Sequence, residues 1–177
     1  LVQLGTDNPF WIAQVAGGQE AARRYGFELV VTSGEGDVTK QVKAFEDLVN
    51  QGVSAISINP LDAKAFGPSM KKAADANIPV VCLFSKMDGC ATVLGFEEVA
   101  NGRLVGQYAV ELLTKKYGEP KGHVAVLLGA LGQDINTNRA GGFEEVIKQY
   151  PNIVIDAQES TGNWEADKAV ALTENWL

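Results

Sequence analysis

Residues 54–84 read SAISINPLDAKAFGPSMKKAADANIPVVCLF, and this stretch sets the expected fold class. An apolar run at 54–58 is followed by a segment of helical period at 63–76 and by a second apolar run at 79–84. Asp62 can cap the start of the helix, and Pro79 suits the first position of a strand because it has no N–H group to donate. The stretch therefore predicts a strand, a helix and a second strand parallel to the first.

The same alternation continues in both directions along the 177 residues. The apolar runs lack strict polar alternation, which is typical of strands covered by helices on both faces. The sequence thus predicts an α/β protein with doubly wound parallel sheets. Further strands are expected at 1–4, 28–32, 92–95, 123–128 and 153–158, and further helices at 9–25, 38–51, 98–117, 137–149 and from 163 to the end.

One stretch is more linker-like than the rest. Residues 115–122, KKYGEPKG, are polar and interrupted by glycine and proline. We expect two lobes that divide there, a first lobe at 1–117 and the beginning of a second lobe at 118–177.

Charge and cysteine content exclude several classes of function. The net charge is -7, from 22 acidic and 15 basic residues without a basic cluster, which argues against binding nucleic acid or an anionic membrane. No apolar run approaches the roughly 20 residues that span a bilayer. Cys82 and Cys90 could form a bridge, but two unbridged cysteines are favoured, and no metal site is expected because the one histidine, His123, precedes a distant strand.

The common catalytic and cofactor motifs are absent. The first strand-to-helix turn lacks G-x-G-x-x-G, and neither G-x-x-x-x-G-K-[ST] nor G-x-S-x-G occurs in the chain. We therefore expect no catalytic residue, no cofactor and no enzymatic activity.

Candidate binding residues follow the predicted strands, because ligands of open α/β sheets bind at the carboxyl ends of the strands. Asn8, Phe10 and Trp11 follow the first strand, Asn59 follows the third, and Arg139 lies beyond the strand at 123–128. Aromatic rings can stack on the C–H face of a sugar while amides and a guanidinium bond its hydroxyls, so the set suits a neutral polyol.

Three of these residues also have a structural interpretation. Trp11 could be the buried first turn of a helix, and Asn59 could form the turn before Pro60. Arg139 could pair with Glu144 or Glu145 of its own helix.

Five motifs in order resemble the ribose-type periplasmic binding proteins of sugar ABC transporters: Asn8–Trp11, Ile58–Pro60 with Asp62, Ile78–Val81, Arg139–Phe143 and Gly162–Trp164. The resemblance implies the type I periplasmic binding protein fold, with two lobes that close by a hinge on a monosaccharide or related polyol. It implies a monomer that delivers its ligand to an ABC permease, in the periplasm or lipid-anchored outside the cell. It also implies that the second lobe is incomplete in this chain, which we expect to be a piece of a longer protein.

The resemblance assigns ligand contacts by position. They are Asn8, Phe10, Trp11, Asn59, Ser85, Glu97, Arg139 and Trp164. The family usually carries an aspartate where this chain has Phe84, and Phe96 replaces a polar position, so we expect a modified sugar or polyol rather than ribose. The alternative function is the effector-binding core of a lactose-repressor-type transcriptional regulator, which would need a helix-turn-helix before Leu1.

Overall fold

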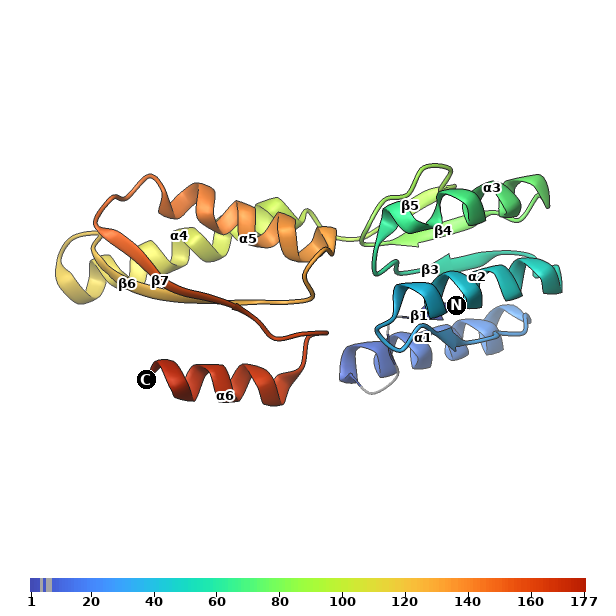
Figure 1. Cartoon of the computed structure of the whole chain (residues 1–177), viewed down its shortest axis with the longest axis horizontal. Coiled ribbons are helices and arrows are strands. Elements are labelled where there is room, and N and C mark those ends of the chain that lie inside the picture. The colour runs from blue at the N-terminus through green and yellow to red at the C-terminus, as the bar shows by residue number, and fades with distance from the viewer. Residues whose placement is uncertain (4, 6–7) are drawn as a thin grey trace. The chain divides into compact units, whose positions relative to one another are not determined.

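The computed structural model describes residues 1–3, 5 and 8–177, which form two compact units, Leu1–Gly95 and Phe96–Leu177. The first unit contains β1 (Val2–Gln3), α1 (Pro9–Tyr25), β2 (Thr32–Ser33), α2 (Val38–Gln51), β3 (Ile56–Ile58), the 3₁₀ helix η1 (Ala63–Phe66), α3 (Gly67–Asp75), β4 (Val80–Leu83) and β5 (Thr92–Leu94). The second contains α4 (Glu98–Tyr117), β6 (Gly122–Leu128), α5 (Asp134–Ile147), β7 (Ile153–Ser160) and α6 (Ala166–Trp176). Figure 1 labels these elements except β2 and η1.

The first unit is built on a five-stranded parallel sheet in the order β2-β1-β3-β4-β5, which confirms the predicted α/β class. Ile58 of β3 stands beside Val2 of β1 on one side and beside Cys82 of β4 on the other. Helices α2 and α3 pack against each other, and Phe45 and Phe66 meet edge to face in the core at 5.7 Å between ring centroids.

Local sequence signals explain where the helices of this unit begin and end. The Asp37 carboxylate caps α2 by accepting from the Lys40 N–H at 2.8 Å, and Asp62 caps η1 in the same way. Gly26 and Gly52 end α1 and α2 with φ of 74° and 68°, a left-handed conformation that glycine adopts without steric cost. The predicted bounds of α1 and α2 are confirmed for this reason.

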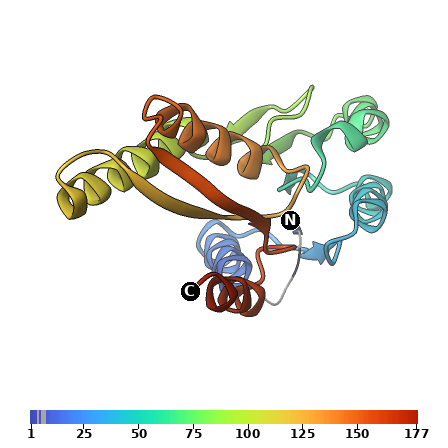
Figure 2. The same cartoon turned by 60° about the vertical axis from the view of Figure 1, so that its left-hand side comes forward.

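The second unit pairs β6 with β7 in parallel and packs α4 along α5, as Figure 2 shows. The helices approach closely because glycines face the opposing backbone: a Cβ on Gly102 would overlap the Arg139 carbonyl oxygen, and one on Gly142 would overlap that of Val99. Helix α4 therefore belongs with the second unit, and the division falls at Gly95–Phe96 rather than at 117–118.

Several other expectations differ from the structure. Helix α5 runs over Asp134–Ile147 rather than 137–149, and strand β2 covers Thr32–Ser33 rather than 28–32. The last helix begins at Ala166 rather than at 163, because Gly162 and Trp164 have φ of 68° and 65°, which a right-handed helix does not allow. The expectation of unbridged cysteines is wrong, since Cys82 and Cys90 form a disulfide. Within the described residues, no helix is long and apolar enough to cross a membrane.

Candidate functional site

The candidate residues of the first unit gather at the carboxyl edge of its sheet. Asn59 directly follows β3, Ser85 lies two residues after β4, and the amino end of α1 follows β1. Strands β1, β3 and β4 are neighbours and parallel, so their carboxyl ends meet at one edge. Leu4, the last residue of the strand expected at 1–4, lies outside the described residues.

Three aromatic side chains form a cluster at this edge. The rings of Phe10 and Trp11 meet edge to face at 4.8 Å between centroids, and Phe10 lies 5.7 Å from Phe84. Trp11 is 7% exposed, whereas Phe10 is 49% exposed. Phe10 is therefore the ring of this pair that a ligand can reach, while Trp11 is enclosed against its edge.

Helix α1 holds Phe10 in place through its own first turn. Asn8 adopts an extended conformation, and its Oδ1 accepts from the Phe10 N–H at 2.9 Å, which makes Asn8 the helix N-cap. Asn8 thus has a structural role as the N-cap. Its side chain is half-buried at the carboxyl edge of the sheet, where the sequence predicted it.

Buried polar atoms lie at the same carboxyl edge of the sheet. Asn59 and Ser85 are 0% and 3% exposed, yet the Asn59 Oδ1 and Nδ2 atoms and the Ser85 Oγ have no hydrogen-bond partner within the described chain. Buried amide and hydroxyl groups ordinarily have partners, because leaving them without one costs about 1–3 kcal/mol. These groups at the ends of β3 and β4 therefore need a partner that the described chain does not supply.

A second amide, Gln41 of α2, holds this edge together. Its Nε2 donates to the backbone carbonyls of Asn59 at 2.8 Å and Gln3 at 3.2 Å, and its Oε1 accepts from the Leu61 N–H at 2.8 Å. Gln41 is 1% exposed and joins the ends of β1 and β3 to the start of the next turn. Sequence reasoning missed it, because a glutamine on a helix gives no signal of burial.

The backbone at Phe84 is held in an uncommon conformation. Its φ is 65°, in the left-handed region that aromatic residues rarely adopt. Its N–H donates to Leu94 O at 2.7 Å, and Gly95 lies against it so closely that a Cβ there would be 2.9 Å from the Phe84 Cα. The turn after β4 therefore leads directly to Ser85, which is buried.

In the second unit, Arg139 of α5 pairs with Glu98 of α4 rather than with Glu144 or Glu145, as the sequence had allowed. Its Nε and Nη2 both donate to the Glu98 carboxylate, the second at 3.1 Å. The Glu98 side chain is 4% exposed and that of Arg139 is 45% exposed. Because the carboxylate neutralises the guanidinium, the pair presents hydrogen-bond donors without a net charge.

Trp164 lies on the same side of this unit as Arg139. The Arg139 guanidinium sits 5.8 Å from the centre of the Trp164 ring, and the Trp164 Nε1 donates to Gln133 Oε1 at 2.8 Å. A Cβ on Gly129 would overlap the ring, so only glycine fits under it. Both Arg139 and Trp164 line a cavity of about 440 Å³ walled by β6, α4 and α5.

Gln133 and Asn136 are polar residues of this unit that sequence reasoning did not single out. Asn136 Oδ1 accepts from the Gly129 N–H at 2.8 Å, while the buried Gln133 Nε2 has no partner among the described residues. Their position just after β6 was the available signal. Glu97 is exposed at the N-cap of α4. The described residues contain no group of side chains suited to a metal ion.

Comparison with known proteins identifies relatives of the whole chain. Residues 1–177 match the family described as periplasmic binding protein domain. A xylitol-binding protein of Mycolicibacterium smegmatis is 31% identical over 158 residues, which cover 88% of this chain and 44% of that protein. The ribose import binding protein of Escherichia coli is 28% identical over 179 residues, covering 100% of this chain and 58% of that protein.

A solved structure gives the same result for the fold. The crystal structure of a galactofuranose binding protein has a TM-score of 0.90 and 29% identity, covering 99% of this chain and 59% of that one. The chain spans about half the length of the curated relatives it matches.

Proposed function

The chain belongs to the periplasmic binding protein domain family, and from this premise we propose that it is the ligand-binding part of an ABC transporter receptor for a neutral sugar or polyol. The observation that carries the proposal is the carboxyl edge of the first unit. There the exposed ring of Phe10 lies in a cluster with Phe84, and Asn59 presents buried amide atoms that no described residue satisfies. A sugar or polyol offers C–H groups for the rings and hydroxyls for the amide.

The ligand is neutral in this proposal because of the Arg139 environment. The guanidinium is already paired with the Glu98 carboxylate, so an anionic ligand would compete with a buried charge. We propose that the second unit contacts the ligand through Arg139 and Trp164. The first unit contacts it through Asn8, Phe10, Trp11, Asn59 and Ser85. Glu97, at the N-cap of α4, is included as a contact on the strength of its position alone.

Because the proposed ligand contacts are divided between the two units, we propose that the units close on the ligand. A ligand that contacts residues of both units binds best to the arrangement in which both reach it, so binding shifts the population toward that arrangement. We expect the radius of gyration, measured by small-angle X-ray scattering, to fall when a sugar binds. A monomer that hands the ligand to a membrane permease completes the proposal.

Export from the cytoplasm agrees with the Cys82–Cys90 disulfide, because such bonds persist in oxidising compartments. We therefore propose a location in the periplasm or on the outer side of a single membrane. Fractionation of cells expressing the gene would place the protein.

The decisive experiment is a thermal shift of the full-length gene product against D-ribose, D-galactose, xylitol, myo-inositol and glycerol, with ribose 5-phosphate as the charged control. Ligands that bind only the folded state raise its melting temperature. We expect one or more neutral compounds to raise it and ribose 5-phosphate to leave it unchanged. A shift with the phosphate alone would contradict the neutral-ligand proposal, and a folded protein that responds to no sugar or polyol would overturn the receptor function.

A further inference from the structure

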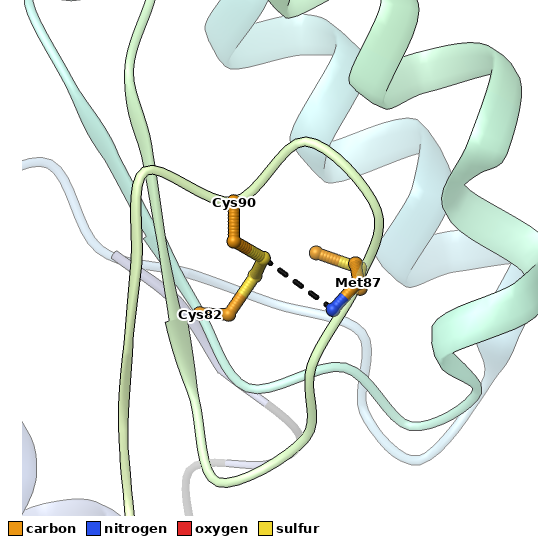
Figure 3. The surroundings of a disulfide bond; sticks show 3 residues. All are labelled: Cys82, Met87 and Cys90. Carbon is orange, nitrogen blue, oxygen red and sulfur yellow. Dashed lines mark hydrogen bonds between the residues drawn. A yellow bond between two sulfur atoms is a disulfide. The ribbon is translucent and has the colours of Figure 1, made fainter.

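The disulfide encloses two of the candidate site residues. Cys82 is the last residue but one of β4, and Cys90 lies two residues before β5. Phe84 and Ser85 lie within the ring of residues 82–90 that the bond closes, and Figure 3 shows the bond crossing the base of this loop. The cross-link and the candidate ligand contacts therefore belong to one short covalent ring.

The loop makes an unusually short connection between parallel strands. Strands β4 and β5 are parallel neighbours, and only residues 84–91 join them, whereas parallel strands ordinarily need a crossover of about a dozen residues or more. Backbone hydrogen bonds hold both ends of the connection: the N–H groups of Phe84 and Ser85 donate to Leu94 O and Leu83 O, each at 2.7 Å, and those of Cys90 and Ala91 donate to Met87 O at 3.3 Å and Val80 O at 2.8 Å. The disulfide is the one covalent restraint on this path.

Two anchors fix the loop to the core of the first unit. Cys82 is fully buried beside Ile58, and Met87 is 4% exposed in the same apolar cluster. The Met87 N–H lies 3.4 Å from Cys90 Sγ, as the dashed line in Figure 3 marks. The bond thus connects the rigid strand to the far end of the loop, with the Phe84–Ser85 turn held between them.

The Phe84–Ser85 turn is the part of the proposed site whose conformation depends most on a covalent restraint. Phe84 keeps a φ of 65° that a free chain would seldom populate, and Ser85 is buried with an unsatisfied hydroxyl. Opening the ring would enlarge the set of conformations that the turn visits. A ligand would then have to order the turn as it binds, which weakens affinity.

We propose that the Cys82–Cys90 disulfide is a positioning element of the binding site, which holds Phe84 and Ser85 ready for the ligand. This inference rests on the proposed function. Reduction by a dithiol transfers two electrons and two protons, breaks the Sγ–Sγ bond, and leaves two cysteine thiols and the cyclic disulfide of the reductant. The reduced protein remains folded but binds more weakly.

The experiment measures the dissociation constants of the panel compounds above, the one with the largest thermal shift first, by calorimetry on the full-length protein in oxidised and reduced form. We expect reduction or Cys90→Ala to weaken binding about tenfold, the cost of ordering a few side chains. Cys90→Ala leaves Cys82 in the core as a small buried thiol. Reduction should not weaken ligand binding by this variant any further. That result would show that the loss of affinity comes from the Cys82–Cys90 bond.

Two controls separate positioning from general destabilisation. Val49→Ala, in α2 and partly buried against the same core, should lower the melting temperature without weakening binding. In a Ser85→Ala background, loss of the bridge should weaken binding less than in the wild type, because the positioned hydroxyl is already gone. Amide exchange at 84–90 should be faster in the reduced form.

The outcomes distinguish this inference from the proposed function. Equal affinity of the oxidised and reduced proteins would overturn the positioning role and leave the receptor function intact. An effect of equal size in the Ser85→Ala and wild-type backgrounds, together with weaker binding by Val49→Ala, would assign the disulfide to stability alone. Binding of no panel compound by the folded oxidised protein would overturn the receptor function and this inference with it.

Discussion

The Arg139 guanidinium and the Glu98 carboxylate form a two-point contact between α5 and α4, with Nη2 and Oε1 3.1 Å apart. The carboxylate is almost fully enclosed, while the guanidinium remains partly accessible. One pair therefore joins two helices and also presents donors beside Trp164.

We predict that Arg139→Ala lowers the free energy of unfolding by about 2 kcal/mol, because it leaves a buried carboxylate unpaired. Adding Glu98→Gln should recover much of that stability without restoring ligand affinity, since the donors are still missing. Urea unfolding and calorimetry measure the two effects. If Arg139→Ala costs the same with either residue at position 98, the pair is not the source of the stability.

The buried amides of Asn59 and Gln41 should respond oppositely to replacement by leucine. Asn59→Leu removes polar atoms that have no partner in the described chain, so stability should hold or rise, while affinity falls about tenfold or more. Gln41→Leu breaks three hydrogen bonds to buried backbone and should cost about 1–3 kcal/mol. Equal destabilisation by the two variants would make Asn59 a structural residue.

Replacing Phe10 should mainly weaken ligand binding, whereas replacing Trp11 should mainly lower the stability of the fold. Trp11→Ala empties a buried site and is expected to cost about 3–5 kcal/mol. Phe10→Ala removes a half-exposed ring, so it should weaken sugar binding more than it lowers the melting temperature. Unchanged affinity in Phe10→Ala would remove this ring from the proposed site.

Adjacent glycines of α5 provide a matched test of the helix contact. Gly142→Ala should destabilise the protein by about 1–3 kcal/mol, because the new Cβ meets the Val99 carbonyl of α4. Gly141 faces open space, and Gly141→Ala should raise stability by about 0.5–1 kcal/mol through helix propensity. Thermal and urea unfolding of both variants would show whether the α4–α5 contact persists in solution.

A carboxylate joining α2 and α3 predicts a pH dependence. Lys72 Nζ at 2.7 Å and Ser69 Oγ at 2.8 Å donate to Glu46, and these bonds, Lys72's first, lower the pKa of Glu46. Because the folded pKa lies below the unfolded one, the stabilisation is present above the unfolded pKa and disappears as the pH falls through the folded pKa. Urea unfolding over this acid range should show a smaller loss in Glu46→Gln than in wild type.

Local patterns were enough to predict most elements. The bounds of α1 and α2 agree with the sequence because a side-chain cap starts each helix and a left-handed glycine ends it. The bounds of α4 agree too, and left-handed Gly118 ends it, although no side chain caps its start. The position of α4 could not be predicted, since it depends on the fit of Gly102 and Gly142 against backbone far away in the chain. The linker-like composition of 115–122 therefore misplaced the boundary.

The candidate site divides in the same way. Its motifs were recognisable because they follow strands, but the partners of Arg139 and Trp164 were not, since Glu98 and Gln133 lie some thirty to forty positions distant. The bridge between Cys82 and Cys90 likewise depends on the chain returning beside β4.

By itself, the sequence determined the α/β class, the order of its elements and the strand ends where ligand residues cluster, because these follow from hydrophobic period and capping over short spans. Only the tertiary structure decided that Phe10 is presented and Trp11 enclosed, that Asn59 is buried with its amide unsatisfied, and that Arg139 is neutralised by Glu98. Burial and charge pairing depend on distant segments packing together, and no local pattern encodes them.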